Sequence, residues 1–320
     1  MPAPEAAATR PLEARIRQEL DDRSHRDDPN VARLVAEIRR RHGDAVKAVL
    51  LYGSYLRGMR DTLLDFYVLL DELAPALPRA QALGNRLLPP NVYYVASAPS
   101  PDVGGEALRA KYATMTLAQF EHSMDDFHSY FWSRFTQPAG LVESSGCDIE
   151  DRVVSAMAGA VHTFVSRTTP MLDAPFTAAA LWQRGLSLTY ASELRSESAT
   201  GIASVYDQYA GYFDAVLEAY AAGAAAAVVA TPAGRYRAAT GAGRGAARFA
   251  WWLRRIQGKG LSVLRLIKAA ATFDDPLDYL LWKIQRHSGI YIEPSNRQRR
   301  HPLLFAWPLL WRLYRRGAFR

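Results

Sequence analysis

The sequence predicts a protein of the mixed α/β (α+β) class, and three observations support this prediction. Residues 1–145 alternate between helical and strand patterns, residues 149–221 are patterned as helices almost throughout, and residues 232–320 are basic and rich in aromatic side chains. At roughly 150 residues per domain, the 320 residues are enough for about two folded domains. We therefore expect an α/β domain at 1–145, a helical domain at 146–231 and a basic amphipathic region at 232–320.

The first domain is expected to begin with helices and continue with strands. Apolar residues at helical spacing predict two helices within residues 11–42, separated by the charged stretch at 21–30. From residue 45 the pattern changes to β-branched and aliphatic runs, which predict strands. The predicted strands lie at 45–53, 63–72, 91–98 and 109–116, and one helix is expected over 117–135.

The remainder of the chain is expected to be mostly helical. The Ala- and Gly-rich segment 219–245 is predicted to be a linker with partial helix. Helices are expected again at 247–270 and 277–287, where Gly289 fits a helix stop. The last segment, 302–320, places apolar and aromatic residues beside arginines.

The net charge of +7 is divided unevenly along the chain. Residues 232–320 hold 18 Lys and Arg against four acidic residues, a net of +14, whereas residues 1–231 hold 21 against 28, a net of −7. This asymmetry indicates a polyanionic partner for the C-terminal part, either nucleic acid or an anionic membrane surface. The alternative is a solvated basic tail.

Cysteine usage and hydropathy narrow the class of protein further. The single cysteine, Cys147, cannot form an internal disulfide and excludes thiolate-clustered zinc and iron–sulfur sites. No run reaches the ~18–20 consecutive apolar residues that a membrane-spanning helix needs. The first residues lack the basic and apolar regions of a secretory signal, so we expect a bacterial cytoplasmic chain.

A Gly-Ser turn followed by a carboxylate is the main candidate site. A strand ending at Gly53-Ser54, a short loop and a second strand bearing Asp65 form the core signature of the nucleotidyltransferase fold. Gly53 lets the backbone approach a triphosphate, Ser54 and exposed amides bond its oxygens, and carboxylates on the next strand hold Mg²⁺. The usual Asp-x-Asp pair would fall at positions 63 and 65, but position 63 is Leu63.

This signature alone also fits a hairpin in which Asp65 is only a solvated strand residue. Asp71 is too distant to replace the missing ligand, because six residues at about 3.3 Å each place it roughly 20 Å along the strand. Asp61, in the loop, is the remaining nearby carboxylate.

Further motifs extend the pattern over about residues 45–195. In order they read Tyr52-Gly53-Ser54, Leu64-Asp65-Phe66, Val92-Tyr93-Tyr94, Lys111-Tyr112, Ser133-Arg134-Phe135-Thr136-Gln137-Pro138, and Leu188-Thr189-Tyr190-Ala191-Ser192-Glu193-Leu194-Arg195. This ordered series resembles the phosphatidate cytidylyltransferase family best known from mitochondria, the translocator assembly and maintenance proteins. In that family an aliphatic residue also stands near the position of the first Asp. Three positions depart from its pattern: Tyr55 and Gln137 replace a glycine and a lysine, and Glu193 replaces an aspartate.

The resemblance implies a reaction in which CTP and phosphatidic acid give CDP-diacylglycerol and pyrophosphate with Mg²⁺. It implies that Asp65 holds the metal, that Tyr52, Gly53 and Ser54 contact the triphosphate, and that Lys111 and Arg134 offset phosphate charge. Tyr190, Glu193 and Arg195 would come from a second, winged-helix-like domain and close the site, with Asp65, Lys111 and Glu193 as the catalytic group. Simpler roles exist: Lys111 as a surface charge, Tyr190 as packing, and Glu193 with Arg195 as an exposed turn.

The lipid substrate implied by the resemblance requires contact with a bilayer. Tryptophans and arginines alternate in the basic region, which suits an interfacial helix lying on an anionic membrane, here the inner face of the bacterial plasma membrane. The residues concerned are Trp251, Trp252, Trp307, Trp311, Arg254, Arg255, Arg312, Arg315 and Arg316, with Lys259, Arg265 and Lys268 as further members of the face. The alternative is that the tryptophans are core and only the arginines face water.

Two other functions remain open at this stage. One is a nucleotidyltransferase acting on another acceptor, such as a small alcohol, a protein or RNA. The other is a catalytically degenerate nucleotidyltransferase-fold protein that binds nucleotide, lipid or nucleic acid, which the leucine at position 63 favours. Duplex binding would not need the aromatic residues of the basic region, whereas single-stranded nucleic acid stacks on them too.

Overall fold

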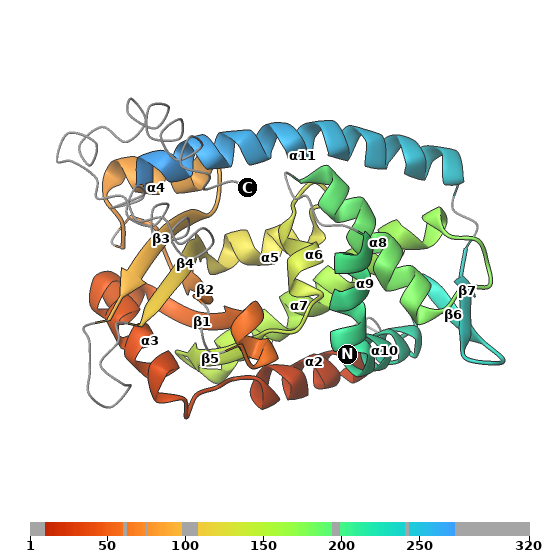
Figure 1. Cartoon of the computed structure of the whole chain (residues 1–320), viewed down its shortest axis with the longest axis horizontal. Coiled ribbons are helices and arrows are strands. Elements are labelled where there is room, and N and C mark those ends of the chain that lie inside the picture. The colour runs from red at the N-terminus through yellow and green to blue at the C-terminus, as the bar shows by residue number, and fades with distance from the viewer. Residues whose placement is uncertain are drawn as a thin grey trace, which may run out of the picture.

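A mixed sheet of five strands organises the first half of the chain (Figure 1). The computed structural model describes residues 10–59, 63–74, 76–97, 108–193, 199–240 and 243–272. Its strand order is β3-β4-β2-β1-β5, with β2 parallel to β4 and the other neighbours antiparallel. The strands are β1 (Val46–Tyr52), β2 (Leu64–Leu70), β3 (Asn91–Ala96), β4 (Arg109–Thr116) and β5 (Gly140–Ser144).

Helices cover both faces of this sheet. One face packs its alternate apolar side chains against α3 (Pro29–His42), which presents Val31, Leu34 and Ile38 to it. The other face, which includes Tyr67 and Leu69 of β2, packs against the helices that follow β4. These are α5 (Leu117–Asp125), α6 (Phe131–Phe135) and α7 (Cys147–Thr168), while α2 (Arg10–Asp22) and α4 (Arg79–Leu87) lie nearer the periphery.

The second half of the chain is a group of helices with one hairpin. Its elements are α8 (Ala178–Ser192), α9 (Ala199–Gln208), α10 (Ala210–Ala221), β6 (Val228–Thr231), β7 (Arg235–Ala238) and α11 (Arg244–Thr272), and the 3₁₀ turns of the chain are Gly43–Ala45, Ser54–Arg57 and Thr169–Met171. Trp182 is fully buried between Phe164 of α7 and Phe213 of α10. A single apolar cluster therefore continues from the sheet into these helices.

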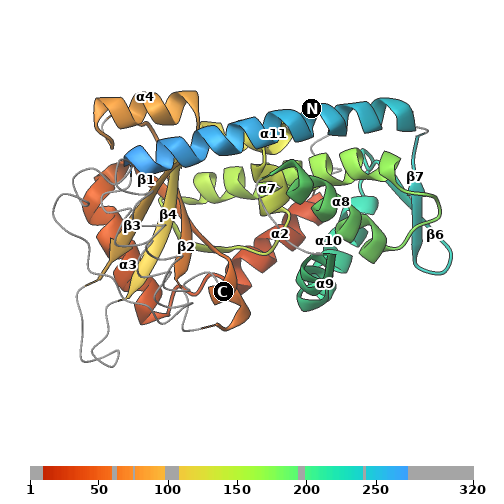
Figure 2. The same ribbon diagram turned by 45° about the horizontal axis from the view of Figure 1, so that its top comes forward.

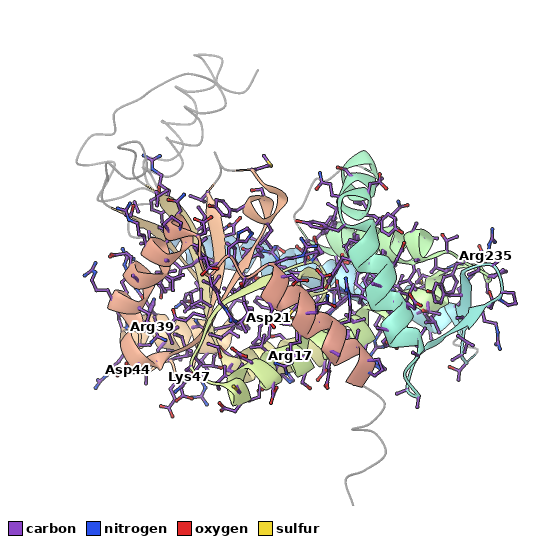
Figure 3. The ribbon with its side chains drawn as sticks, turned by 90° about the horizontal axis from the view of Figure 1, so that it is seen from below. Arg17, Asp21, Arg39, Asp44, Lys47 and Arg235 are labelled. Carbon is purple, nitrogen blue, oxygen red and sulfur yellow. The ribbon has the colours of Figure 1, made fainter. Side chains whose placement is uncertain are left out.

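The sheet and the hairpin lie at opposite ends of the molecule. Seen from below, Arg39 of α3 and Lys47 of β1 are at one end and Arg235 of β7 is at the other, with α2 between them (Figure 3). Helix α11 runs along the side of the molecule from the hairpin back toward α4 and β3 (Figure 2). Near its end, Lys268 Nζ donates to Pro90 O at 2.7 Å and to Asn91 Oδ1 at 3.0 Å, which ties α11 to the start of β3.

Most of the elements expected from the sequence are present. The two N-terminal helices and the first four strands are confirmed, as is the helix over 247–270. Asp28 explains where the second helix begins, because its Oδ1 accepts a hydrogen bond from the Asn30 amide as an N-cap. The expectations for 277–287 and 302–320 lie outside the described residues.

Three expectations about secondary structure are wrong or incomplete. The helix expected over 117–135 is two helices, because Asp126 and Ser129 bond the amides of His128 and Phe131 and form a turn between them. The strand β5 was not expected. The supposed linker at 219–245 contains the hairpin β6–β7, whose turn places Ala233 and Gly234 at positive φ.

Within the part of the chain that the structure describes, no helix is both long enough and apolar enough to cross a membrane.

The packing of α7 against α8 leads to a stability prediction at Gly185. A Cβ there would lie 2.2 Å from Phe164 Cζ, so Gly185→Ala should lower the free energy of unfolding by about 1–3 kcal/mol through overpacking. Gly211 of α10 is the matched control, since a Cβ there meets nothing within 4 Å and alanine favours the helix by about 1 kcal/mol. Urea unfolding followed by circular dichroism measures both, and a Gly185→Ala protein as stable as the parent would contradict this packing.

Candidate active site

Gly53 brings the end of β1 against the carboxylate of Asp65. Its φ of 90° and ψ of −154° belong to a region that side chains rarely adopt. A Cβ at this position would lie 3.0 Å from Asp65 Oδ2, so any other side chain here would crowd that oxygen. The glycine expected to approach a ligand therefore lies directly beside the expected metal ligand.

Strand register places Asp65 between Tyr52 and Lys111. Asp65 lies opposite Tyr52 on β1 and opposite Lys111 on β4. The Lys111 Nζ is 3.5 Å from Asp65 Oδ1, and the two side chains are 34% and 23% exposed. Lys111 is thus the ion-pair partner of Asp65, rather than only the surface charge that one alternative suggested.

Arg134 of α6 lies over a group of tyrosine rings. Its guanidinium carbon is 5.3 Å from the ring centroid of Tyr52, 5.5 Å from that of Tyr130 and 6.0 Å from that of Tyr67, and Nη1 donates to Tyr52 Oη at 3.3 Å. Burial opposes the charge, but the three phenol groups and Glu193 outweigh it and raise the pKa of Arg134 above its ordinary value. Arg134 is therefore a permanent cation at this position.

A pocket of about 340 Å³ opens beside this group, within the size range of small-molecule sites. Four of the expected nucleotide-binding residues, Tyr52, Gly53, Arg134 and Tyr190, contribute to its lining. The other lining residues are Met59, Gln137, Pro138, Ser204, Val205, Gln208 and Tyr209. Residues from distant parts of the chain thus meet at one concave surface.

The remaining predicted residues lie next to this pocket or outside the described structure. Ser54 follows Gly53 and begins the 3₁₀ turn, while Asp65 and Lys111 lie just behind Gly53. Glu193 ends α8, where its amide donates to Tyr190 O at 3.1 Å, and its charge acts on Arg134. Arg195 falls outside the described residues.

Two of the departures from the family pattern are explained by their surroundings. The Tyr55 side chain is buried in the core on the α3 side, and its hydroxyl donates to Asp28 Oδ2 at 2.6 Å. It therefore adds no bulk to the pocket. Gln137 does line the pocket, and its Nε2 donates to Ser133 O at 3.1 Å. The amide thus occupies the place of the expected lysine without its charge.

Sequence reasoning missed the contributions of α9 and α11. Ser204 and Gln208 of α9 enter the pocket lining, although their segment shows only helical periodicity. Arg254 of α11 is 2% exposed, with its guanidinium carbon 4.4 Å from the Trp132 ring centroid. Burial lowers the pKa of Arg254 to about 9, and Glu193 supports its charge. The sequence WWLRR around Arg254 could have indicated this buried contact, since arginine often packs on tryptophan.

This burial corrects the expected membrane-facing surface. Trp251 is 4% exposed and packs against Phe127 and Trp132, so Trp251 and Arg254 belong to the interior. Trp252, by contrast, is 56% exposed. Trp307 and Trp311 lie outside the described residues, as do the arginines near them.

Asp65 is suited to hold one Mg²⁺ in the presence of a nucleotide. Among the described residues no group of three or more His, Cys, Asp or Glu side chains could bind a metal by itself. Mg²⁺ is commonly held by one or two carboxylates together with substrate phosphates and water. The partly exposed carboxylate of Asp65, beside Gly53, could supply one such ligand.

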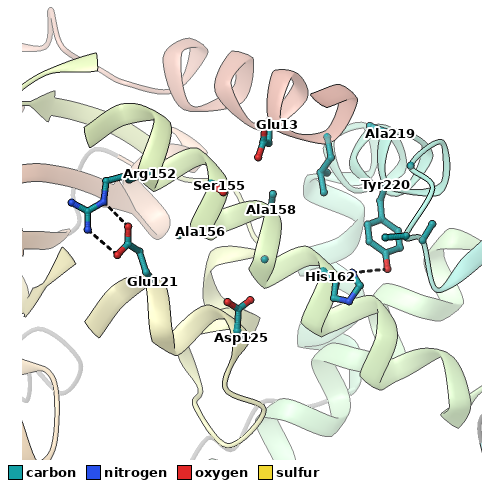
Figure 4. A pocket seen from close by; sticks show the side chains of 15 residues that line it. Glu13, Glu121, Asp125, Arg152, Ser155, Ala156, Ala158, His162, Ala219 and Tyr220 are labelled. Atoms are coloured by element: carbon teal, nitrogen blue, oxygen red, sulfur yellow. Dashed lines mark hydrogen bonds and ion pairs between the residues drawn. The ribbon is translucent and has the colours of Figure 1, made fainter. Parts of the chain in front are cut away.

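A larger pocket of about 800 Å³ lies elsewhere, between α2, α5, α7 and α10 (Figure 4). Glu121 and Arg152 pair across it at 2.7 Å, and Tyr220 Oη lies 3.2 Å from His162 Nδ1. It contains none of the residues predicted from the Gly-Ser and Asp65 motifs. We therefore regard the smaller pocket as the candidate active site.

Comparison with known proteins adds no identification, because neither protein-family models nor curated proteins match the chain.

The contact between Gly53 and Asp65 can be tested by substitution. Gly58→Ala should cost about 1 kcal/mol of stability, because Gly58 has a φ of 79° but a Cβ added there would meet no atom within 4 Å. Gly53→Ala should cost about 2–3 kcal/mol, because it adds the contact with Asp65 to a backbone region reserved for glycine.

Chemical unfolding of a double-mutant cycle isolates the contact. Asp65→Ala should recover part of the loss caused by Gly53→Ala and none of that caused by Gly58→Ala. Strict additivity of Gly53→Ala and Asp65→Ala would show that the two residues do not interact.

Proposed function

We propose that this protein is a phosphatidate cytidylyltransferase, which converts CTP and phosphatidic acid into CDP-diacylglycerol and pyrophosphate. The observation that supports this most directly is that residues from separate motifs of the chain lie together: Gly53 and Arg134 line one pocket, Asp65 lies beside Gly53, and Lys111 pairs with Asp65. Tyr190 of α8 completes that group from the second half.

The architecture supports the corresponding fold assignment. A Gly-Ser turn that joins two neighbouring strands, the second bearing Asp65, is the arrangement required of a nucleotidyltransferase fold. The hairpin β6–β7 after α8, α9 and α10 is compatible with a winged-helix-like second domain. The proposal is therefore that the pocket lies where these two units meet.

The reaction is a displacement at phosphorus without electron transfer. An oxygen of the phosphatidic acid phosphate forms a bond to the α-phosphorus of CTP, and the bond from that phosphorus to the oxygen bridging to the β-phosphorus breaks. Mg²⁺, with Asp65 as a protein ligand, would neutralise charge on the leaving pyrophosphate. The chain contributes positioning and charge: Gly53 permits close approach of the triphosphate, and Lys111 and Arg134 offset its negative charge.

Helix α11 supports an anionic membrane surface as the partner. Its outward side exposes Phe249, Trp252, Leu253, Ile256, Val263 and Leu264, with the exposed basic residues Arg248, Arg255 and Lys259 among them. Apolar and aromatic side chains next to basic ones suit a helix lying in the interface of an anionic bilayer. We therefore place the protein, as part of the proposal, at the inner face of the bacterial plasma membrane.

A second candidate function is that of a degenerate nucleotidyltransferase-fold protein that only binds its ligands. Two observations favour it: Leu63 occupies the position of the first carboxylate of the usual Asp-x-Asp pair, and Lys111 pairs with the second, Asp65. The same pocket also fits a nucleotidyltransferase acting on another acceptor. Measuring turnover with different acceptors distinguishes the binding-only protein, the transferase for another acceptor and the proposed cytidylyltransferase.

Pyrophosphate release is the direct test of the proposed reaction. Purified protein with Mg²⁺, CTP and phosphatidic acid in mixed micelles should release pyrophosphate only when both substrates are present. Asp65→Asn should lower the rate about 100-fold or more, because it removes the charge that binds the metal. Asp71→Asn is the matched control, since Asp71 lies beyond the far end of β2 and is 66% exposed.

The outcomes separate the alternatives. Release with CTP and an acceptor other than phosphatidic acid would identify a different nucleotidyltransferase. Absence of release with every nucleoside triphosphate, from folded protein, would leave the binding function.

Membrane contact through α11 is testable by liposome flotation. Replacing the exposed Trp252 and Ile256 by Gln should weaken binding to vesicles containing anionic lipid about ten-fold, because apolar area that enters the interface is lost. Val229→Gln is the control, since Val229 is 39% exposed on β6. Equal losses for both proteins, or equal binding to neutral vesicles, would rule out a specific role of this helix face.

A further inference from the structure

Helix α11 differs from an ordinary surface helix in how its residues are distributed. Its outward side carries large apolar residues among basic ones, and its inward side carries three cations. Large apolar residues such as Trp252 and Ile256 face outward, whereas Arg254, Arg265 and Lys268 face the protein. A surface helix of a globular protein normally buries its apolar side. The inward cations therefore need a separate explanation.

Two of these inward cations are accounted for by their contacts. Lys268 Nζ donates to the carbonyls of Leu88 and Pro90 and to Asn91 Oδ1, so it joins α11 to the turn before β3. Arg254 packs against Phe127, Trp132 and Trp251.

Arg265 differs from both, because it lies beside the candidate active site. Its guanidinium carbon is 4.5 Å from the ring centroid of Tyr130, the same ring that lies 5.5 Å from the guanidinium carbon of Arg134. The guanidinium carbons of Arg265 and Arg134 are thus separated by no more than the sum of their two distances to the Tyr130 ring centroid. The Nε of Arg265 donates to Pro89 O at 3.3 Å, a neutral partner.

The carboxylate that acts on this pair of cations, that of Glu193, acts on Arg134 from beyond ion-pair distance. Within the described part of the chain, neither Arg134 nor Arg265 has a carboxylate oxygen within ion-pair distance, whereas Lys111 has Asp65. Two guanidinium groups against one aromatic ring, neither of them in an ion pair among the described residues, leave charge that an anion can neutralise. Guanidinium geometry suits the oxygens of a phosphate group in particular.

We propose that Arg134 and Arg265, arranged around Tyr130, form the subsite for the phosphate monoester of the acceptor substrate. This inference rests on the proposed function and names the residues that bring the acceptor to the nucleotide. A displacement between two phosphate compounds must overcome the repulsion of like charges, and cations next to both reduce it. Arg134, which lines the pocket and also approaches Tyr130, lies between the two positions.

The position of Arg265 favours the acceptor over the nucleotide. The nucleotide end of the site consists of Gly53, Asp65 and Lys111, at the end of β1 and near the starts of β2 and β4. Arg265 belongs instead to α11, two residues beyond Val263, which is 46% exposed on the outward apolar side. A lipid phosphate bound at Arg265 would therefore be held by the helix whose opposite side is proposed to meet the bilayer.

The test measures binding and turnover separately on the full chain. Wild type, Arg265→Gln, Arg265→Lys and Arg184→Gln are compared, where Arg184 is an exposed arginine of α8 outside the proposed binding surfaces and controls for loss of one positive charge. Isothermal titration with glycerol 3-phosphate and with short-chain, water-soluble phosphatidic acid measures the subsite, and titration with CTP measures the nucleotide end. Thermal unfolding verifies that each variant is folded.

The proposal expects Arg265→Gln to bind both phosphate monoesters about ten-fold or more weakly, since a charged hydrogen-bonding partner is lost. Arg265→Lys should recover part of this affinity, while CTP binding in both variants and phosphate binding in Arg184→Gln should stay within about two-fold of wild type. Tighter binding of the short-chain lipid than of glycerol 3-phosphate identifies a lipid phosphate as the ligand, and equal binding identifies the phosphate group alone. Either result supports the subsite.

Other outcomes overturn it. Undiminished phosphate binding by folded Arg265→Gln, an equal loss in Arg184→Gln, or no phosphate binding by wild type would each remove the subsite. Binding that depends on Arg265 without any pyrophosphate release would support the subsite and overturn the cytidylyltransferase function. If the enzyme is active, the subsite also predicts that Arg265→Gln raises the KM for phosphatidic acid and leaves the KM for CTP unchanged.

Discussion

The register of β2 between β1 and β4 is the constraint on which the candidate site depends. Because side chains alternate along a strand, the register that buries Phe66 and Val68 against α3 also turns Asp65 and Tyr67 toward the opposite face. A slip by one residue would move Asp65 into the α3 core and Tyr67 away from Arg134. The core on both faces of the sheet therefore determines where the carboxylate and its neighbours lie.

Contacts between cations and aromatic rings then connect the sheet with the helices. Arg134 of α6 lies over Tyr52 and Tyr67 of the sheet, and Arg254 of α11 lies over rings from α6 and from α11 itself. Such contacts let a guanidinium group be buried with few hydrogen bonds; the Nε and Nη1 of Arg254 have none in the described structure. Charge is thereby retained close to the pocket, where an arrangement of carboxylate ion pairs would cancel it.

The sequence was most informative where local pattern and local chemistry coincide. Strand periodicity predicted β1 to β4, and the Gly-Ser turn with Asp65 predicted residues that the register does bring together. The helix break at Asp126, the strand β5 and the hairpin β6–β7 escaped because each depends on a few hydrogen bonds or on a partner distant in sequence. The inward position of Arg254 escaped for a related reason: periodicity alone cannot tell which side of a mixed helix meets the core.

The opposed sides of α11 have a thermodynamic consequence. The same rigid element presents Trp252 to the outside and Arg265 to Tyr130, so a partner that binds its outer side only in the docked position also favours the arrangement of the arginines within. Linkage requires the converse: an anion held by those arginines strengthens attachment of the outer side by the same factor. Under the proposed function, surface attachment and ligand binding would therefore be coupled through the position of this one helix.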